Sequence, residues 1–301
     1  MKKNYMMFQP MHGIAVELQV IETAAKIAKI LNRILVLPKV PILETLHYEL
    51  GFEEYFDFPN NFEYIGTNEF LELYQHIDKE FHIIPKYKKE YVNENVGTLH
   101  TTWLSLIHNA DYYSILNLEI KKKIKVSLMN PISLKDARKI FTCDDKVIAF
   151  NYLNGLLESK EYPFTFSKDF FKGYYTTPTP KKLIYIDNLD NYTSVHWRRG
   201  TNVIEVSKEL WGIKLPSYDK VKNKIETKKV YVSTDTPKDL LKFKNDFIVI
   251  DKPQIDSPTL SAIYDINASI EADIFIGNIY STFSNYIYHC RLEKGKPSVF
   301  V

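Results

Sequence analysis

The sequence predicts an α/β protein of two domains, each built on a parallel β-sheet, and three observations lead to this fold class. Near the N-terminus an apolar strand, residues 5–8, is followed by a turn, a helix-patterned segment and a second apolar strand. From residue 183 to the C-terminus, strand and helix patterns alternate. Between these parts, residues 176–182 contain two prolines, which block regular structure and mark a linker. We therefore expect domains at residues 1–178 and 179–301, with sheets that face a cleft.

The N-terminal unit is a strand, turn, helix, strand pattern. The helix begins at about Val16, and its apolar residues recur at helical spacing up to Leu31. The second strand, residues 34–37, is stopped by Pro38. Such a unit predicts a parallel, right-handed crossover. Its first turn, His12-Gly13, comes at the strand end where open α/β sheets place ligands, although one glycine is no phosphate-binding fingerprint.

Residues 41–180 are rich in aromatic side chains and have no clean period. The pattern predicts short helices at residues 42–50, 68–74, 133–141 and 166–173. The basic run at residues 121–125 is interpreted as a solvated helix end. The second half predicts strands at residues 183–186, 193–198, 229–233, 247–250, 274–276 and 298–301. Helices are expected between them at residues 237–243, 259–272 and 282–291.

Composition excludes several classes of protein. Apolar residues make up 45% of the 301 residues, which is enough for a real core. Lys and Arg total 39 against 37 Asp and Glu, so the net charge of +2 gives no basic field for nucleic acid. Only Cys143 and Cys290 occur, far apart, which argues against a zinc site or disulfides and favours a reducing compartment. No run of about 18 apolar residues predicts a membrane span, and Gln9 and Pro10 interrupt any signal-peptide core. We expect a cytoplasmic protein.

Polar residues gather after three predicted strands of the second half. They are residues 196–202, 232–237 and 276–284, and they bring hydroxyls, amides or charges to the loops where open α/β sheets bind ligands. Arg198 offers a planar fork suited to phosphate oxygens. Ser281 and Thr282 open a helix whose first free backbone N–H groups suit an anion. Each feature alone also fits a surface Arg pair, a turn or a simple helix cap, but the three together favour a phosphate site.

These motifs resemble those of the GDP-fucose protein O-fucosyltransferases and the related α1,2- and α1,6-fucosyltransferases. The similar segments are His196-Trp-Arg198-Arg-Gly200-Thr-Asn202, Val230-Tyr-Val-Ser-Thr234-Asp235 and Ala272-Asp-Ile-Phe-Ile-Gly-Asn278-Ile-Tyr-Ser281-Thr-Phe283, with Tyr5-Met-Met-Phe-Gln-Pro10 and Ala28-Lys-Ile-Leu-Asn-Arg-Ile-Leu-Val-Leu-Pro38 near the N-terminus. The resemblance covers both ends of the chain but not residues 53–181. It implies a GT-B-like fold of two Rossmann-like domains, with the donor GDP-fucose held by the second and the acceptor side formed by the first.

The resemblance also implies roles for single residues. Arg198 matches the catalytic arginine that contacts the donor diphosphate. The other expected donor-binding residues are His12, Gly13, His196, Asn202, Thr234, Asp235, Asp273, Ser281, Thr282 and Phe283. Among these, Asp273 matches an acidic residue near the guanine, and Ser281, Thr282 and Phe283 match the loop that binds the donor phosphates.

The chain departs from the family pattern at two places. Asn202 stands where an acidic residue is usual, and Gly13-Ile-Ala-Val-Glu-Leu18 replaces Gly-x-x-Asn-Gln. The resemblance implies fucose transfer with inversion to a hydroxyl of a glycan or of a protein Ser or Thr. Since the chain has no Asp-x-Asp, we expect neither a metal nor a cofactor. Glu17 and Asp187 are candidates for the general base only by elimination. Two alternatives remain open: a nucleotide-sugar-binding protein without transferase activity, and the same fold acting on another nucleotide sugar.

Overall fold

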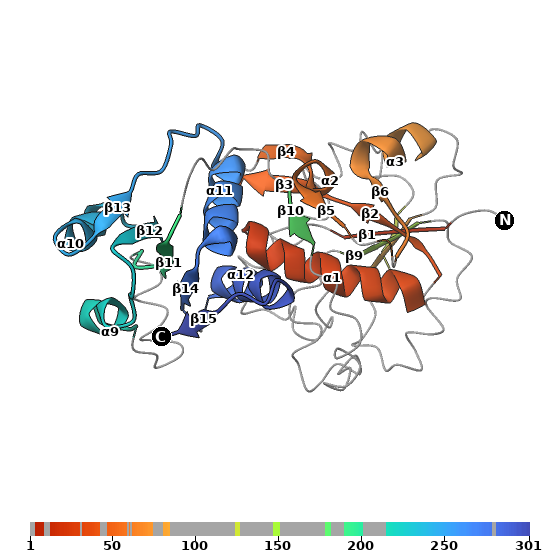
Figure 1. The fold of residues 1–301 in the computed structure, drawn as a ribbon. Helices are drawn as coiled ribbons and strands as arrows, with labels where there is room; N and C mark the ends of the chain where they lie inside the picture. The colour runs from red at the N-terminus through yellow and green to blue at the C-terminus, as the bar shows by residue number, and fades with distance from the viewer. Residues whose placement is uncertain are drawn as a thin grey trace, which may run out of the picture. The chain divides into compact units, whose positions relative to one another are not determined.

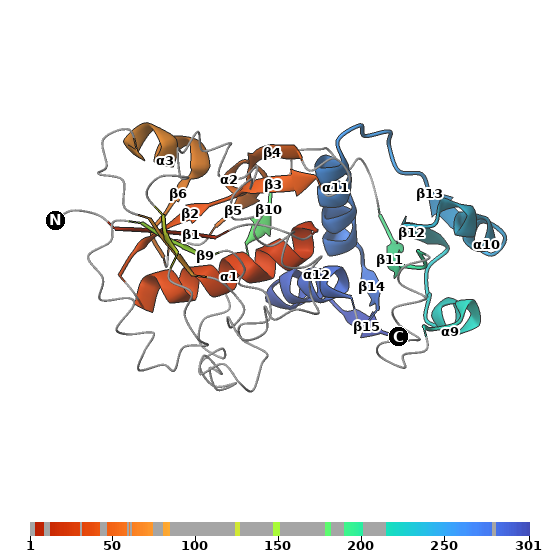
Figure 2. The same ribbon diagram turned by 180° about the vertical axis from the view of Figure 1, so that it is seen from behind.

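The structure is a computed structural model that describes residues 4–8, 13–30, 32–42, 47–58, 60, 62–74, 81–84, 124–126, 147–150, 178–181, 190–200, 215–278 and 281–301 (Figures 1 and 2). The chain divides into two compact units, Met1–Pro178 and Thr179–Val301. Parallel sheets with flanking helices form both units, so the predicted α/β class is confirmed.

The first unit is built on a parallel sheet with strand order β6-β2-β1-β9-β7-β8. The predicted strand, helix, strand crossover is confirmed: β1 (Tyr5–Phe8) and β2 (Ile34–Leu37) pair in parallel on either side of α1 (Ile14–Ile30). The other strands are β6 (Tyr64–Gly66), β7 (Phe81–Ile84), β8 (Ile124–Val126) and β9 (Val147–Phe150).

Helices cover both faces of this sheet. In Figures 1 and 2, β1, β2 and β9 lie between α1 and α3 (Thr67–Tyr74). All four residues of β1 are buried. The ring of Phe70 in α3 meets Tyr5 edge-on at 5.4 Å between centroids. A strand that is apolar at every position is what burial on two faces requires.

Several predictions for the middle of the chain are corrected by the structure. The helix expected at residues 42–50 is wrong, because β3 (Lys39–Ile42) and β4 (His47–Gly51) pair there as an antiparallel hairpin. The basic run at residues 121–125 is not a helix end where the structure describes it, since β8 starts at Ile124. The helix at residues 68–74 is confirmed by α3. The helices expected at residues 133–141 and 166–173 and the strand at 183–186 lie outside the described residues.

Short elements that the sequence did not predict complete the described part of the chain. They are α2 (Phe52–Tyr55), β5 (Phe56–Asp57), β10 (Thr179–Pro180) and α9 (Tyr218–Lys222). None of the helices in the described ranges is long and apolar enough to cross a lipid bilayer.

The second unit contains a five-stranded, fully parallel sheet with strand order β13-β12-β11-β14-β15. The strands predicted beyond residue 190 and the helices between them are confirmed within a few residues. The elements are β11 (Tyr192–Trp197), β12 (Lys229–Thr234), η3 (Pro237–Asp239), α10 (Leu240–Lys244), β13 (Ile248–Ile250), α11 (Pro258–Glu271), β14 (Ile274–Gly277), α12 (Thr282–Glu293) and β15 (Ser298–Phe300).

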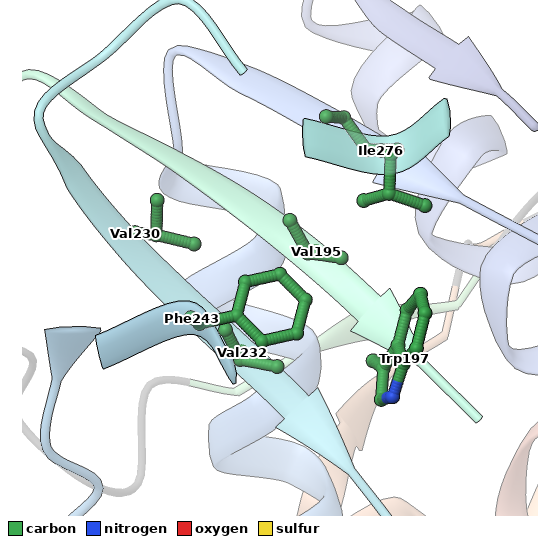
Figure 3. Packing of buried hydrophobic residues seen from close by; sticks show 7 residues of the cluster. Val195, Trp197, Val230, Val232, Phe243 and Ile276 are labelled. Atoms are coloured by element: carbon green, nitrogen blue, oxygen red, sulfur yellow. The ribbon is translucent and has the colours of Figure 1, made fainter. Parts of the chain in front are cut away.

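Alternate residues of β11 pack against different helices, as the two-residue period of a strand requires. On one face, Val195 and Trp197 pack with Phe243 of α10 and with Val230 and Val232 of β12 (Figure 3). On the other face, the Tyr192 hydroxyl donates to the Ala268 carbonyl of α11 at 2.6 Å, and Ser194 contacts Ser269 at 2.8 Å. His196 continues this second face at the end of the strand, where α12 begins.

Candidate functional site

The candidate site lies at the carboxyl ends of three neighbouring strands. Trp197 at the end of β11 stands opposite Thr234 at the end of β12, and Val195 stands opposite Ile276 of β14. Because all three strands run in parallel, the loops that follow them leave the sheet at the same edge. This edge brings together the predicted residues His196, Arg198, Thr234, Asp235, Ser281, Thr282 and Phe283.

Asp235 connects two of these loops through its carboxylate. One oxygen, Oδ1, accepts the backbone N–H of Arg199 at 2.7 Å, and Oδ2 accepts the backbone N–H of Gly200 at 2.9 Å. The hydroxyl of Thr236 also donates to Oδ1 at 3.1 Å. The negative charge of Asp235 would repel a phosphate, but its carboxylate is engaged in hydrogen bonds with the protein's own backbone. Asp235 shapes the loop that carries Arg198, a role that the sequence did not indicate.

Within the described part of the chain, the guanidinium of Arg198 is held only loosely. Its Nε lies 3.9 Å from Asp235 Oδ2, which is long for an ion pair, and 44% of its side chain is exposed. A cation in this situation keeps most of its N–H donors available to a ligand. Arg198 is therefore suited to bind an anion at the edge of the sheet.

Arg199 points to the other face of the strand, as its alternation predicts. Its guanidinium carbon lies 3.9 Å from the centroid of the Trp197 ring, and the guanidinium donates to the carbonyl of Pro216. The Trp197 indole in turn donates to Asp239 Oδ2 at 2.9 Å. The Arg-Arg pair therefore splits into one arginine packed into the fold and one facing the site.

The N-terminus of α12 adds backbone donors to this edge. Ser281 is the N-cap, and its Oγ accepts the N–H of Ser284 at 3.4 Å, while its carbonyl accepts the N–H of Asn285 at 2.9 Å. The N–H groups of Thr282 and Phe283 precede these bonds and have no acceptor within the helix. With the helix dipole, they form a partial positive charge suited to an anion.

His196 lies between Arg198 and the first turn of α12. Its ring is 4.9 Å from the ring of Phe283 between centroids, and its Nδ1 is 2.7 Å from Ser284 Oγ. Burial, and secondly the charge of Arg198, lower the pKa of His196 from 6.5 to about 4, although Asp235 opposes this shift. The imidazole is therefore neutral at neutral pH.

Asp273 is not brought together with the other candidates. It precedes β14, so it lies at the amino ends of the strands, one strand length of about 13 Å from the loops described above. There its Oδ2 accepts the backbone N–H of Tyr192 at 2.9 Å, and its own N–H donates to the Tyr192 carbonyl at 3.1 Å. These contacts join the first residues of β11 and β14.

The remaining candidates belong to the first unit or lie outside the described residues. Gly13 is exposed, and its carbonyl accepts the N–H groups of Val16 at 2.9 Å and Glu17 at 3.2 Å, so it opens α1. Glu17 is buried in the first turn of that helix. His12, Asn202 and Asp187 are not among the residues that the structure describes. No group of three or more His, Cys, Asp or Glu side chains in the described ranges could hold a metal ion.

The sequence missed Ser284, whose buried hydroxyl contacts both His196 and the backbone N–H of Asn278 at 3.0 Å. The signal available in the sequence was the Ser281-x-x-Ser284 spacing. It places Ser284 at the third helical position, whose backbone N–H donates to the side chain of the N-cap residue. The sequence could not show that this residue meets a histidine 88 positions earlier in the chain.

Comparison with solved structures identifies the fold. POFUT1 in complex with GDP-fucose superposes with a TM-score of 0.67 and 16% identity over 99% of this chain and 98% of that chain. POFUT1 in complex with GDP gives a TM-score of 0.67 and 17% identity over 100% of this chain and 98% of that chain. The fucosyltransferase NodZ from Bradyrhizobium gives 0.49 and 15% identity over 96% and 93%.

The sequence itself matches no protein-family model and none of the curated proteins with which it was compared. At these identities the structural match to POFUT1 establishes the fold. The GT-B-like fold implied by the sequence motifs is therefore confirmed.

Proposed function

We propose that this chain is a glycosyltransferase that moves fucose from GDP-fucose to a hydroxyl group, with inversion and without a metal ion. One observation carries the proposal: a loosely held Arg198, the ring of His196 and the N-terminus of α12 meet at a single sheet edge. They do so in a chain with the fold of POFUT1, which has been crystallised with GDP-fucose. The acceptor is a hydroxyl of a glycan or of a protein Ser or Thr, and the low cysteine content supports a cytoplasmic one.

The chemical task is to stabilise the negative charge that grows on the β-phosphate as the glycosidic bond breaks. The guanidinium of Arg198 supplies a full positive charge in a planar fork. The N–H groups of Thr282 and Phe283, which have no acceptor within the helix, add the partial charge of a helix N-terminus. Donors fixed in advance lower the energy of such a transition state because they need no reorganisation. These groups can take the place that a divalent cation has in other transferases.

The proposal is tested by measuring GDP release from GDP-fucose, with and without candidate glycan and peptide acceptors. Arg198→Ala is expected to lower the rate by about 100- to 1000-fold, the usual cost of removing one such donor. Lys224→Ala removes one positive charge from an exposed position after α9 and should leave the rate unchanged. A chelator is expected to have no effect. Normal turnover by Arg198→Ala would disprove the proposal.

Asn202 supports a second candidate, a protein that binds a nucleotide sugar without transferring it, because the resembling enzymes usually have an acidic residue at this position. Calorimetry with GDP separates the two functions when it is combined with the release assay. Tight binding without release for every acceptor would favour the binding protein. Thermal shifts with GDP-fucose, GDP-mannose and UDP-sugars then test which nucleotide sugar is the ligand. In Asn202→Asp, a gain in transfer would mark a position that tunes the site.

A further inference from the structure

The hydroxyl of Ser284 is surrounded in a way that fixes the direction of its hydrogen bonds. Ser284 is completely buried. Its Oγ accepts the backbone N–H of Asn278 at 3.0 Å and lies 2.7 Å from Nδ1 of His196. A serine hydroxyl can accept two hydrogen bonds but carries a single proton to donate. One of its two neighbours, the Asn278 N–H, is a donor and cannot accept that proton.

Among the residues that the structure describes, Nδ1 of His196 is the acceptor within reach of the Ser284 proton. If Nδ1 carried the proton instead, two donors would point at Oγ, and the buried Ser284 proton would have no acceptor among the described residues. Leaving a buried donor without a partner is unfavourable. Ser284 therefore donates to Nδ1, and a neutral imidazole then carries its proton on Nε2.

We infer that Ser284 is a positioning residue that holds His196 in the Nε2–H tautomer, so that the ring offers a neutral N–H donor to an anion at the sheet edge. The identity of this anion, the diphosphate of a nucleotide sugar, rests on the proposed function. In the described part of the chain Nε2 has no protein partner, and it faces away from Ser284, so its proton is available to a ligand.

The local packing brings Ser284 to the ring. Gly277 ends β14, and a Cβ there would lie 3.1 Å from Ser284 Cβ and 2.9 Å from the Phe275 ring, so glycine allows the first turn of α12 to approach the sheet. The bond from the Ser284 N–H to Ser281 Oγ fixes the same turn. Phe283 lies against the imidazole ring at 4.9 Å between centroids.

The charges around the ring also favour a neutral donor. Arg198 follows His196 on the same strand, and Asp235 faces it from the loop after β12. The first turn of α12, residues 282–285, and Asn278 after β14 contribute only uncharged side chains. A second cation beside Arg198 would be repelled, whereas a neutral N–H can bind a phosphate oxygen without taking up a proton.

The tautomer is measured directly by ¹⁵N NMR of the histidine rings in the ligand-free protein at neutral pH. His196→Gln identifies the signals of His196. We expect a pyridine-type Nδ1 and a pyrrole-type Nε2 in the unsubstituted protein. A pyrrole-type Nδ1, or a doubly protonated ring, would overturn the inference. This measurement needs neither catalysis nor a ligand, so it decides the question even if the Ser284 variants fail to fold.

Variants of Ser284 test its part in the tautomer and in binding. In Ser284→Ala both tautomers of His196 should be populated, so that the ¹⁵N chemical shifts of its two ring nitrogens become averaged. The same variant is expected to weaken GDP binding by up to about tenfold. Ser284→Thr restores a hydroxyl and should recover both readouts. Ser257→Ala removes a serine hydroxyl elsewhere in the same unit, that of the N-cap of α11, and should change neither readout. An unchanged His196 spectrum in folded Ser284→Ala would contradict the inference. Failure of every protein to bind GDP would refute the proposed function and leave the NMR result standing.

Discussion

The carboxylate of Asp235 and the backbone of Gly200 fit each other closely. Oδ2 accepts the Gly200 N–H at 2.9 Å, and a Cβ added to Gly200 would lie 2.7 Å from the same oxygen. Glycine allows this close approach, because a side chain at this position would push the carboxylate away. Since Asp235 follows β12 and Gly200 follows β11, this contact fixes the Arg198 loop relative to the neighbouring strand.

Gly200→Ala and Asp235→Ala are expected to weaken GDP binding by the same route, through displacement of the Arg198 loop. Asp235→Ala should also lower the free energy of unfolding by about 1–2 kcal/mol, because two backbone N–H groups lose a charged acceptor at a partly hydrated position. In the double variant, the loss of GDP-binding free energy should be smaller than the sum of the two single losses, with a coupling of at least about 0.5 kcal/mol. The reason is that the clash between an alanine at position 200 and the carboxylate needs both partners. Calorimetry with GDP and urea unfolding measure the two quantities.

The control for this cycle is Asp251→Ala. Asp251 is 84% exposed and pairs with Lys244 at 3.4 Å, so its loss should change stability by less than about 0.5 kcal/mol. Strictly additive effects of Gly200→Ala and Asp235→Ala would show that the carboxylate and the glycine do not act on one another.

A second prediction concerns acid stability. The pKa of His196 is about 4 in the folded protein, below the 6.5 of an unperturbed histidine, because of burial and then of Arg198. The unfolded chain therefore binds more protons between these values, and stability rises with pH across this window. The contribution of His196 is fully present above about pH 6.5 and is lost as the pH falls to about 4. It amounts to at most about 3 kcal/mol.

His196→Gln is expected to flatten the stability curve between about pH 6.5 and 4, because the titrating group is gone. Urea unfolding at a series of pH values measures the difference. His289→Gln, which removes another histidine of the same unit, should keep the acid-sensitive limb. An equally steep limb in His196→Gln would mean that other groups cause it.

The second sheet could be predicted from sequence because its strands are short apolar runs separated by helical patterns. Residues 39–51 were harder: Leu43, Leu46 and Leu50 recur at helical spacing, yet residues on both sides pair as an antiparallel hairpin. Pairing between segments overrides a weak local period in such short runs. Pro41 sits beside a register shift in that hairpin, where a strand tolerates proline.

The candidate site was predictable where residue type and strand end coincide, as for Arg198 and Ser281. It was not predictable where function depends on contacts between distant segments. The sequence motifs predict that Asp235 binds the donor. In the structure its carboxylate accepts the backbone N–H groups of residues 199 and 200, a contact that spans up to 36 positions. Residue type indicates which chemistry is available, whereas tertiary packing decides to which partner it is directed.

Arg291 is a buried cation that the sequence gives no reason to expect. It ends the predicted part of α12, yet its side chain is completely buried and is surrounded by carbonyl groups. Nη1 and Nη2 donate to the carbonyls of Ser269 (2.9 Å), Ile270 (2.8 Å), Ala272 (2.7 Å), Asp273 (3.0 Å) and Pro297 (2.6 Å), and Nε donates to Ser298 Oγ at 3.1 Å. Burial lowers the pKa of Arg291 to about 10, so it stays charged at neutral pH.

Arg291→Met should therefore lower the free energy of unfolding by about 3 kcal/mol or more. The last carbonyls of α11 have no N–H donor within the helix. Without Arg291, those that it binds would be buried without a partner at the negative end of the helix dipole. Arg291→Lys should also destabilise, because an ammonium cannot reach carbonyls on both sides as the planar guanidinium does. Lys294→Ala, which breaks an exposed pair with Glu271 at 2.9 Å, should cost no more than about 1 kcal/mol. Urea unfolding compares the three, and an Arg291→Met protein as stable as the Lys294→Ala protein would show that these bonds contribute little net stability.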